Sequence, residues 1–236
     1  NINLDLMYAL PNQTLDGALA DVERAIALHP AHLSHYQLTL EPGTPFAKRP
    51  PPLPDHDAAW DMQEACQALL AAAGHAQYEV SAYARQDRRC RHNLNYWRFG
   101  DYLGIGAGAH GKVTGYQAND NLVVHRRWKM KHPRTYMDAA AGSDRIGGDE
   151  TLAVEQLPFE FMLNALRLND GVAADAFTAR TGLPVGAIAA PLREARRNGW
   201  LVDDPGRLQA TPLGRRFLND VIEAFLPARK PERRHA

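Results

Sequence analysis

The chain has 236 residues, of which 45% are hydrophobic and 23% charged, so it can form one or two globular domains and is not disordered as a whole. Its 27 basic and 27 acidic residues give a formal net charge of +0, which argues against a dedicated nucleic-acid-binding protein. The two cysteines, Cys66 and Cys90, cannot form a disulfide scaffold, a four-thiolate zinc site or a cluster site of three or four thiolates, and are predicted to be free thiols of a cytosolic protein.

The first half of the chain alternates predicted strands and helices. Strands are expected at residues 1–8, 33–40, 78–82 and 102–106. Helices are expected at residues 15–26, capped by Thr14 or Asp16, and from about 57 to 73, with Gly74 as a C-terminal cap. This alternation indicates βαβ units with a parallel sheet. Four strands are too few for a closed eight-stranded barrel, so they suit an open α/β domain or part of a barrel whose other strands lie upstream.

The start of the chain lies inside a predicted strand, and its first residue is Asn1 rather than Met. Residues 1–8 have neither the basic nor the apolar region of a signal peptide. No apolar run reaches the roughly 18 residues that span a membrane. We therefore expect a cytoplasmic protein, with an upstream segment absent from this sequence.

The second half has a different pattern. Residues 114–150 form a mixed, glycine-rich connection with little periodicity. Helices are then predicted at 152–168, at 174–180 and up to Asn198, followed by a hairpin over 200–210 and a last helix from the Thr211 cap to Phe225. Three helices and a hairpin in this order are the winged-helix pattern. Residues 229–236 are a polar tail.

Two motifs are set aside on physical grounds. Residues 106–111 match G-x-G-x-x-G, but no helix is predicted after them to hold a pyrophosphate, so we reject a dinucleotide fingerprint. The glycines then serve either the close approach of a ligand or a tight turn. His32 and His35 lie three residues apart on a predicted strand, which directs them to opposite faces and argues against a shared metal ion.

Two groups of residues suggest ligand binding. His92, Asn93, Tyr96 and Trp97 combine aromatic faces that could stack on a flat ligand with a histidine that could ligate heme iron, and the alternative is a polar loop whose rings cover the core. Asp5 lies on an otherwise apolar strand, where a carboxylate needs either a ligand hydroxyl or a structural hydrogen bond.

Three clusters of basic residues each allow two functional interpretations. Arginines at 85–91 and the basic residues of 125–132 could bind propionates or another carboxylate, or could be a solvated face. Arg193, Arg196 and Arg197 lie on the predicted third helix of the winged-helix pattern, where they suit DNA binding or an interaction or lid module.

Four segments carry a family resemblance. Residues 3–14, 33–44, 78–83 and 90–110 resemble the radical S-adenosylmethionine proteins related to oxygen-independent coproporphyrinogen III oxidase. The pattern His92-Asn93-x-x-Tyr96-Trp97 resembles the signature of the heme chaperone branch of that family. The resemblance runs through nearly the whole chain.

This resemblance implies a fold and cofactors. The fold is α/β: part of a TIM-like radical SAM barrel at 1–113, a connecting segment at 114–150, a winged-helix-like α+β domain at 151–228 and a tail at 229–236. The family holds a [4Fe–4S] cluster on a C-x-x-x-C-x-x-C loop and S-adenosyl-L-methionine on a G-G-G-T-P strand. Neither motif occurs here, so we expect the cluster ligands to be missing and no radical activity from this chain alone.

The resemblance also implies site residues and a function. Asp5 matches an acidic contact to S-adenosylmethionine, and Thr39 and His110 match positions that line the adenosine. His92, Asn93, Tyr96 and Trp97 match the heme-associated motif. The implied function is a chaperone that binds heme and delivers it to heme-accepting respiratory proteins, with peripheral membrane association and no nucleic-acid partner. The alternatives are an oxygen-independent coproporphyrinogen III oxidase of porphyrin biosynthesis and a winged-helix interaction or DNA-binding module.

Overall fold

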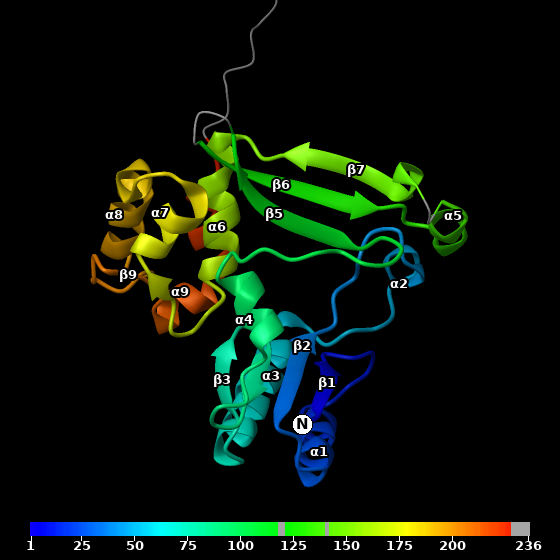
Figure 1. Cartoon of the computed structure of the whole chain (residues 1–236). Coiled ribbons are helices and arrows are strands. Elements are labelled where there is room, and N and C mark those ends of the chain that lie inside the picture. The colour runs from blue at the N-terminus through cyan, green and yellow to red at the C-terminus, as the bar shows by residue number, and fades with distance from the viewer. Residues whose placement is uncertain (118–120, 140–141, 228–236) are drawn as a thin grey trace, which may run out of the picture. The chain divides into compact units, whose positions relative to one another are not determined.

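The computed structural model describes residues 1–117, 121–139 and 142–227. The predicted tail at 229–236, residue 228 and parts of the predicted connection (118–120 and 140–141) lie outside the described residues. The chain divides into two compact units, Asn1–Arg91 and His92–Ala236 (Figure 1).

The first unit is built on a four-stranded sheet in the order β1-β2-β4-β3. Its strands are β1 (Asn3–Tyr8), β2 (His32–Gln37), β3 (Ala76–Glu79) and β4 (Ala82–Ala84). Its helices are α1 (Leu15–Ala27), α2 (Pro45–Lys48) and α3 (His56–Ala72). α1 and α3 contact each other and β1, and enclose a core that includes Tyr8, Val22, Leu33, Met62 and Leu70 (Figure 1).

Local sequence explains both long helices of this unit. The Thr14 hydroxyl accepts a hydrogen bond from the Gly17 amide at 3.2 Å, so Thr14 rather than Asp16 caps α1. Asp55 caps α3 in the same way, and the left-handed φ of +83° at Gly74 terminates it as predicted.

The predicted parallel sheet is right for β1 and β2 only. These two strands pair in parallel, with Asp5 opposite Ser34, but β4 is antiparallel to both β2 and β3. The third predicted strand is wrong as a single element, because the chain turns between Glu79 and Ala82 and forms a hairpin. The Ser81 hydroxyl donates to the Glu79 carboxylate at 3.1 Å within this turn.

The fourth predicted strand, at 102–106, is also wrong. Only Tyr102 forms a β-bridge, with Lys112. Gly104 lies so close to the His110 carbonyl that a Cβ there would be 2.4 Å from the oxygen, and Gly106 has φ +105°. These glycines therefore serve a tight chain reversal, the second of their two predicted roles.

The second unit contains a three-stranded antiparallel sheet of β5 (His110–Tyr116), β6 (Leu122–Lys129) and β7 (Ile146–Thr151). Much of this sheet, together with α5 (Pro133–Asp138), occupies the segment expected as a connection. The strand β5 follows the glycine motif where a dinucleotide site needs a helix, which confirms that the motif is not a fingerprint.

The remaining elements of the second unit are mostly helical. They are α4 (Arg91–Trp97), the 3₁₀ turns 143–145, 154–156 and 185–188, α6 (Leu157–Ala165), β8 (Val172–Ala173), α7 (Asp175–Thr181), α8 (Ala189–Arg197), β9 (Arg207–Leu208), α9 (Pro212–Arg216) and α10 (Leu218–Glu223). Thr211 caps α9 as predicted, but the last predicted helix is broken at Phe217. Phe161 is fully buried and contacts both Phe99 and Phe177 edge to face, with ring centroids 5.7 and 5.3 Å away.

The length and apolar character of a helix decide whether it can span a membrane. Within the described ranges, none of them combines the length and apolar character needed to cross a bilayer.

Candidate functional site

The helix α4 carries the predicted aromatic motif. His92 and Tyr96 are four residues apart and therefore share a helix face, with ring centroids at 4.7 Å and an interplanar angle of 63°. Tyr96 also stacks on Tyr102, with centroids 4.0 Å apart, and contacts Trp97 edge to face at 6.3 Å. The structure thus brings three of the four predicted motif residues into one aromatic cluster, and Tyr102 is a member that the sequence analysis missed.

Exposure differs among the motif residues. The His92 side chain is exposed, whereas Asn93, Tyr96 and Trp97 are half-buried. The Arg167 guanidinium lies over the Trp97 ring, 4.2 Å from its centroid. Rings that are half-buried can cover the core and still present an edge to a ligand. An exposed imidazole beside them can coordinate a metal at the centre of a flat ligand.

The loop after α4 fixes the end of this helix. Phe99 has φ +55° and is buried, and the Gly100 amide donates to the Asn95 carbonyl at 2.7 Å. The Asn95 side-chain amide donates to the Asp101 carbonyl at 2.8 Å. A Cβ at Gly100 would be 2.1 Å from the Asn95 side chain, so glycine is required at this position.

A charge network around the buried Lys112 and the exposed Asp101 involves this loop and was not foreseen. Lys112 is 2% exposed, its ammonium is 2.9 Å from Asp101 Oδ1, and it lies 4.1 Å from the centroid of the Phe99 ring. The Thr114 amide and hydroxyl also donate to the Asp101 carboxylate, at 2.9 and 2.7 Å.

Burial and bonding act on the charged groups of this network in opposite directions. Burial lowers the pKa of Lys112. Burial alone would raise the pKa of Asp101, but the hydrogen bonds from Thr114 and Lys112 outweigh it and lower that pKa. The pair joins β5 to the loop that follows α4, so it supports the aromatic cluster structurally. The sequence alone could have predicted the Lys112–Asp101 pair only if the pairing of β5 had been known.

Asp5 belongs to a hydrogen-bonded chain on one face of β1 and β2. Its carboxylate accepts from the Asn3 side-chain amide at 2.9 Å, and the Asn3 side-chain oxygen lies 2.6 Å from His32 Nδ1. His32 Nε2 lies 2.8 Å from the Tyr78 hydroxyl. Because the Asn3 oxygen can only accept, Nδ1 carries the proton and Nε2 accepts from Tyr78. The structural hydrogen bond expected as one alternative for Asp5 is present, and the Asp5 side chain remains exposed.

Thr39 and His110, the other two residues predicted to contact S-adenosylmethionine, lie in different units of the chain. Asp5 pairs with Ser34 of β2, and Thr39 follows the end of that strand. The Thr39 hydroxyl donates to the Glu41 carboxylate at 2.8 Å. His110 belongs to the other unit, is exposed, and stacks on Trp128 with centroids 5.9 Å apart.

The prediction that His32 and His35 face opposite sides of the sheet is confirmed. His35 is buried and stacks on Tyr8, with centroids 4.7 Å apart and planes inclined by 23°. Burial lowers its pKa to about 4, so it is neutral at pH 7. His32 instead contacts Asn3 and Tyr78 on the other side.

Several of the predicted basic residues have structural partners. Arg126 forms an ion pair with Glu160, and Arg127 with Asp149. The Arg196 guanidinium donates to the carbonyls of Val202, Asp204 and Arg207, at 3.3, 2.8 and 3.4 Å, and so connects α8 to the segment 202–207. Arg196 is therefore engaged within the fold, while Arg193 and Arg197 are exposed.

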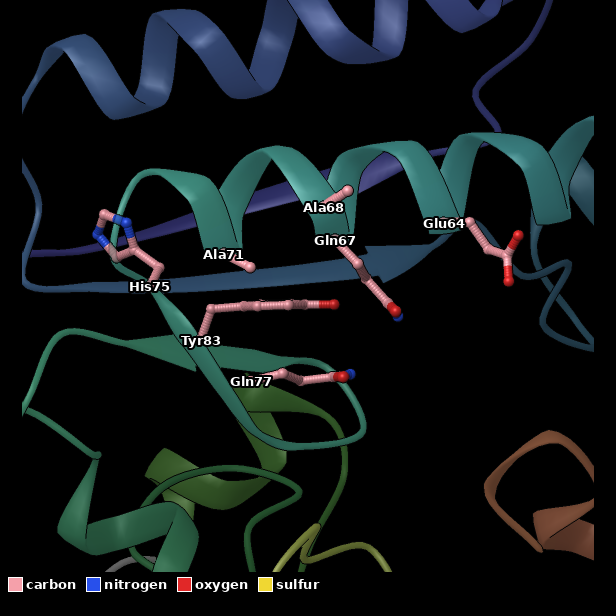
Figure 2. A pocket seen from close by; sticks show the side chains of 7 residues that line it. All are labelled: Glu64, Gln67, Ala68, Ala71, His75, Gln77 and Tyr83. Atoms are coloured by element: carbon pink, nitrogen blue, oxygen red, sulfur yellow. The ribbon is translucent and has the colours of Figure 1, made fainter. Parts of the chain in front are cut away.

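A cavity of about 460 Å³ lies in the first unit between α3 and the β3–β4 hairpin (Figure 2). It is lined by Glu64, Gln67, Ala68, Ala71, His75, Gln77 and Tyr83. Figure 2 shows the His75 ring directed away from the other lining side chains, and its Nε2 is 3.0 Å from the Pro30 carbonyl. Burial raises the pKa of Tyr83, so its phenol is neutral. No predicted site residue lines this cavity.

Comparisons with known proteins give consistent results. Residues 152–217 match the family model described as the HemN C-terminal domain. The chain is 47% identical over 226 residues to "Heme chaperone HemW" of Escherichia coli K12, and 45% identical to that of Haemophilus influenzae. These matches cover 96% of this chain, and 58% and 57% of the two relatives. The chain thus spans somewhat more than half the length of these curated relatives.

A more distant relative and a solved structure agree with this. "Heme chaperone HemW" of Mycobacterium tuberculosis is 34% identical over 235 residues, which is 96% of this chain and 55% of that protein. The solved structure is described as "Coproporphyrinogen III oxidase (HemN) from Escherichia coli is a Radical SAM enzyme". It matches with a TM-score of 0.72 at 18% identity, over 94% of this chain and 54% of that one, so the two share a fold of mixed α/β content.

Proposed function

We propose, from the similarity of this chain to HemW and HemN, that its protein is a heme chaperone, which binds heme and delivers it to respiratory proteins. The observation that carries this proposal is the similarity to HemW at 47% identity over 96% of the chain, a span that includes α4. The likeness to HemN at 18% identity supports the fold and carries no argument for oxidase activity.

The chain's own residues suggest how heme would be held. The exposed His92 imidazole would coordinate the iron, and the half-buried rings of Tyr96 and Trp97 would contact the macrocycle. Tyr102 would keep Tyr96 in place by stacking on it. We assign Asn93 to the same motif, as the half-buried neighbour of His92.

The finer description of the fold is part of this proposal. We propose that residues 1–113 correspond to part of a TIM-like radical SAM barrel and residues 151–228 to a winged-helix-like domain. The segment 114–150 would connect the two and carries most of the β5–β7 sheet. The order of α6, α7, α8 and the strand β9 is compatible with a winged helix. We also propose a cytoplasmic location with peripheral association at the membrane, where respiratory acceptors lie.

S-adenosylmethionine, when bound in radical SAM proteins, is the source of the radical. Asp5 fits a contact to it, because its exposed carboxylate can accept from a ligand hydroxyl while Asn3 holds it in place. The Thr39 hydroxyl is engaged with Glu41, so Thr39 would contribute backbone or apolar contact, and His110 would contribute the ring that stacks on Trp128.

A [4Fe–4S] cluster does not fit the cysteines of this chain. Cys66 is buried in the core of the first unit, and burial raises its pKa to about 11, whereas a cluster ligand must be a thiolate. Cys90 alone cannot hold a cluster.

Transfer to an acceptor tests the chaperone proposal. The hemin-loaded chain is mixed with a heme-free respiratory cytochrome, and the acceptor spectrum is followed over time. We expect transfer faster than the release of heme to an excess of apomyoglobin, because direct delivery does not wait for dissociation. Equal rates with both acceptors would mean that heme is only released, and would contradict the delivery role.

A further inference from the structure

The three-stranded sheet of the second unit has one packed face and one open face. Strand alternation places Lys112 and Val124 on the packed face, where both are buried. The residues of the opposite face line a cavity of about 630 Å³, within the size range of ligand pockets. From the three strands these are Gly111, Val113, His125, Arg127, Lys129, Asp149 and Thr151. We call this set the open sheet face.

Two exposed aliphatic side chains form another wall of the same cavity. Leu103 and Ile105 line it and are 79% and 87% exposed, and Val113 beside them is 44% exposed. Leu103 directly follows Tyr102, which stacks on Tyr96. Three large apolar side chains exposed around one cavity indicate that a ligand or partner covers them.

The polar groups of the open sheet face favour an anionic ligand. Arg127 is paired with Asp149, while no described acidic group pairs with the half-buried Lys129, so the cavity has an excess positive charge. His125 Nδ1 lies 3.0 Å from the Thr151 hydroxyl at the same face. Gly104 and Gly111 also line the cavity, so the backbone at these two positions is not covered by a side chain.

We propose that the open sheet face is a second contact site for heme, separate from the motif on α4, and that it binds the carboxylate-bearing side of the tetrapyrrole. Leu103 and Ile105 would contact the macrocycle, and Lys129 would pair with a carboxylate of the ligand. The combination of an apolar wall with cations at one side matches a flat amphipathic dicarboxylate. This inference rests on the proposed function, since it takes heme as the cargo.

Hemin titrations that compare two ligands test this site. The chain is titrated with hemin and with hemin dimethyl ester, which lacks the carboxylate charges, and the Soret band is followed. We expect Lys129→Ala to weaken hemin binding about tenfold and to leave binding of the ester unchanged, because a charge-assisted contact of this kind is worth roughly that factor. Leu103→Ser combined with Ile105→Ser should weaken the binding of both hemin and its dimethyl ester.

Control variants separate this inference from the proposed function. Lys48→Ala, at the exposed end of α2, should have no effect on either ligand. His92→Ala should leave the difference between hemin and its ester intact, because the two sites are separate. Saturable hemin binding that Lys129→Ala and the double serine variant do not change would overturn the second site and leave the chaperone proposal standing. Absence of saturable hemin binding to the unaltered chain would overturn both.

Discussion

The rings of Tyr96 and Tyr102 stack with their centroids 4.0 Å apart and their planes inclined by 26°. Tyr96 is on α4, and Tyr102 forms the β-bridge to Lys112 at the edge of β5. The stack therefore connects the proposed heme motif to the sheet whose opposite face carries the second cavity.

Replacing Tyr102 should destabilise the chain and weaken heme binding. Tyr102→Leu keeps apolar volume but removes the ring stack, and we expect the free energy of unfolding to fall by about 1 kcal/mol. Urea unfolding followed by circular dichroism measures this. Tyr116→Leu is the matched control, because Tyr116 is 72% exposed. Equal effects of both substitutions would show that the stack contributes nothing.

Removing the buried ammonium of Lys112 should destabilise the chain more strongly. Lys112→Ala loses the pair with Asp101 and the contact with Phe99, and we expect a loss of about 2 kcal/mol. Lys112→Met should lose less, because methionine fills the space without a charge to desolvate. Unfolding in urea compares the two with Lys48→Ala, and a larger loss for methionine than for alanine would contradict this explanation.

The buried His35 should make stability depend on pH. Its folded pKa of about 4 lies below the unfolded value of 6.5, so the unfolded state takes up a proton first as pH falls. The contribution of neutral His35 is complete above pH 6.5 and is lost between pH 6.5 and about 4, by up to roughly 1.4 kcal/mol per pH unit.

His35→Phe should flatten this acid limb, because it keeps the ring against Tyr8 and cannot take up a proton. His56→Phe, at the exposed start of α3, should not flatten it. The measurement is the urea midpoint at several pH values from 7.5 to 4.5. An unchanged slope in His35→Phe would assign the acid loss to other groups.

The two cysteines should differ in reactivity. Cys66 is 0% exposed with its pKa raised to about 11 by burial, whereas Cys90 is half-buried next to α4. A chromogenic disulfide reagent at pH 8 should modify one thiol rapidly and the second only after unfolding. Cys90→Ser should remove the fast phase, and a fast phase that persists in that variant would place a reactive thiol at Cys66.

Local signals predicted the parts of the fold that local chemistry controls. Thr14, Gly74 and Thr211 have the predicted capping roles, because a cap depends on residues within one turn. The opposite orientations of His32 and His35 followed from strand alternation alone.

The sequence analysis missed the parts of the fold that depend on pairing between segments far apart in the chain. The segment 78–82 was predicted to be one strand, because its apolar pattern does not reveal the turn between Glu79 and Ala82. The sheet of β5, β6 and β7 lies largely in a segment without clear periodicity. The network of Lys112 and Asp101 could not be foreseen without that sheet. The aromatic motif on α4 was identified from its residue types and from the family resemblance, but its stacking on Tyr102 depends on the fold.

The measurement that tests the central claim most directly is an equilibrium titration of this chain with hemin, followed by the Soret band. We predict saturable binding by the unaltered chain and by His56→Ala, and weaker binding with a shifted Soret maximum in His92→Ala and Tyr96→Ala. The same affinity and the same Soret maximum in all four proteins would contradict the assignment of the heme motif to α4.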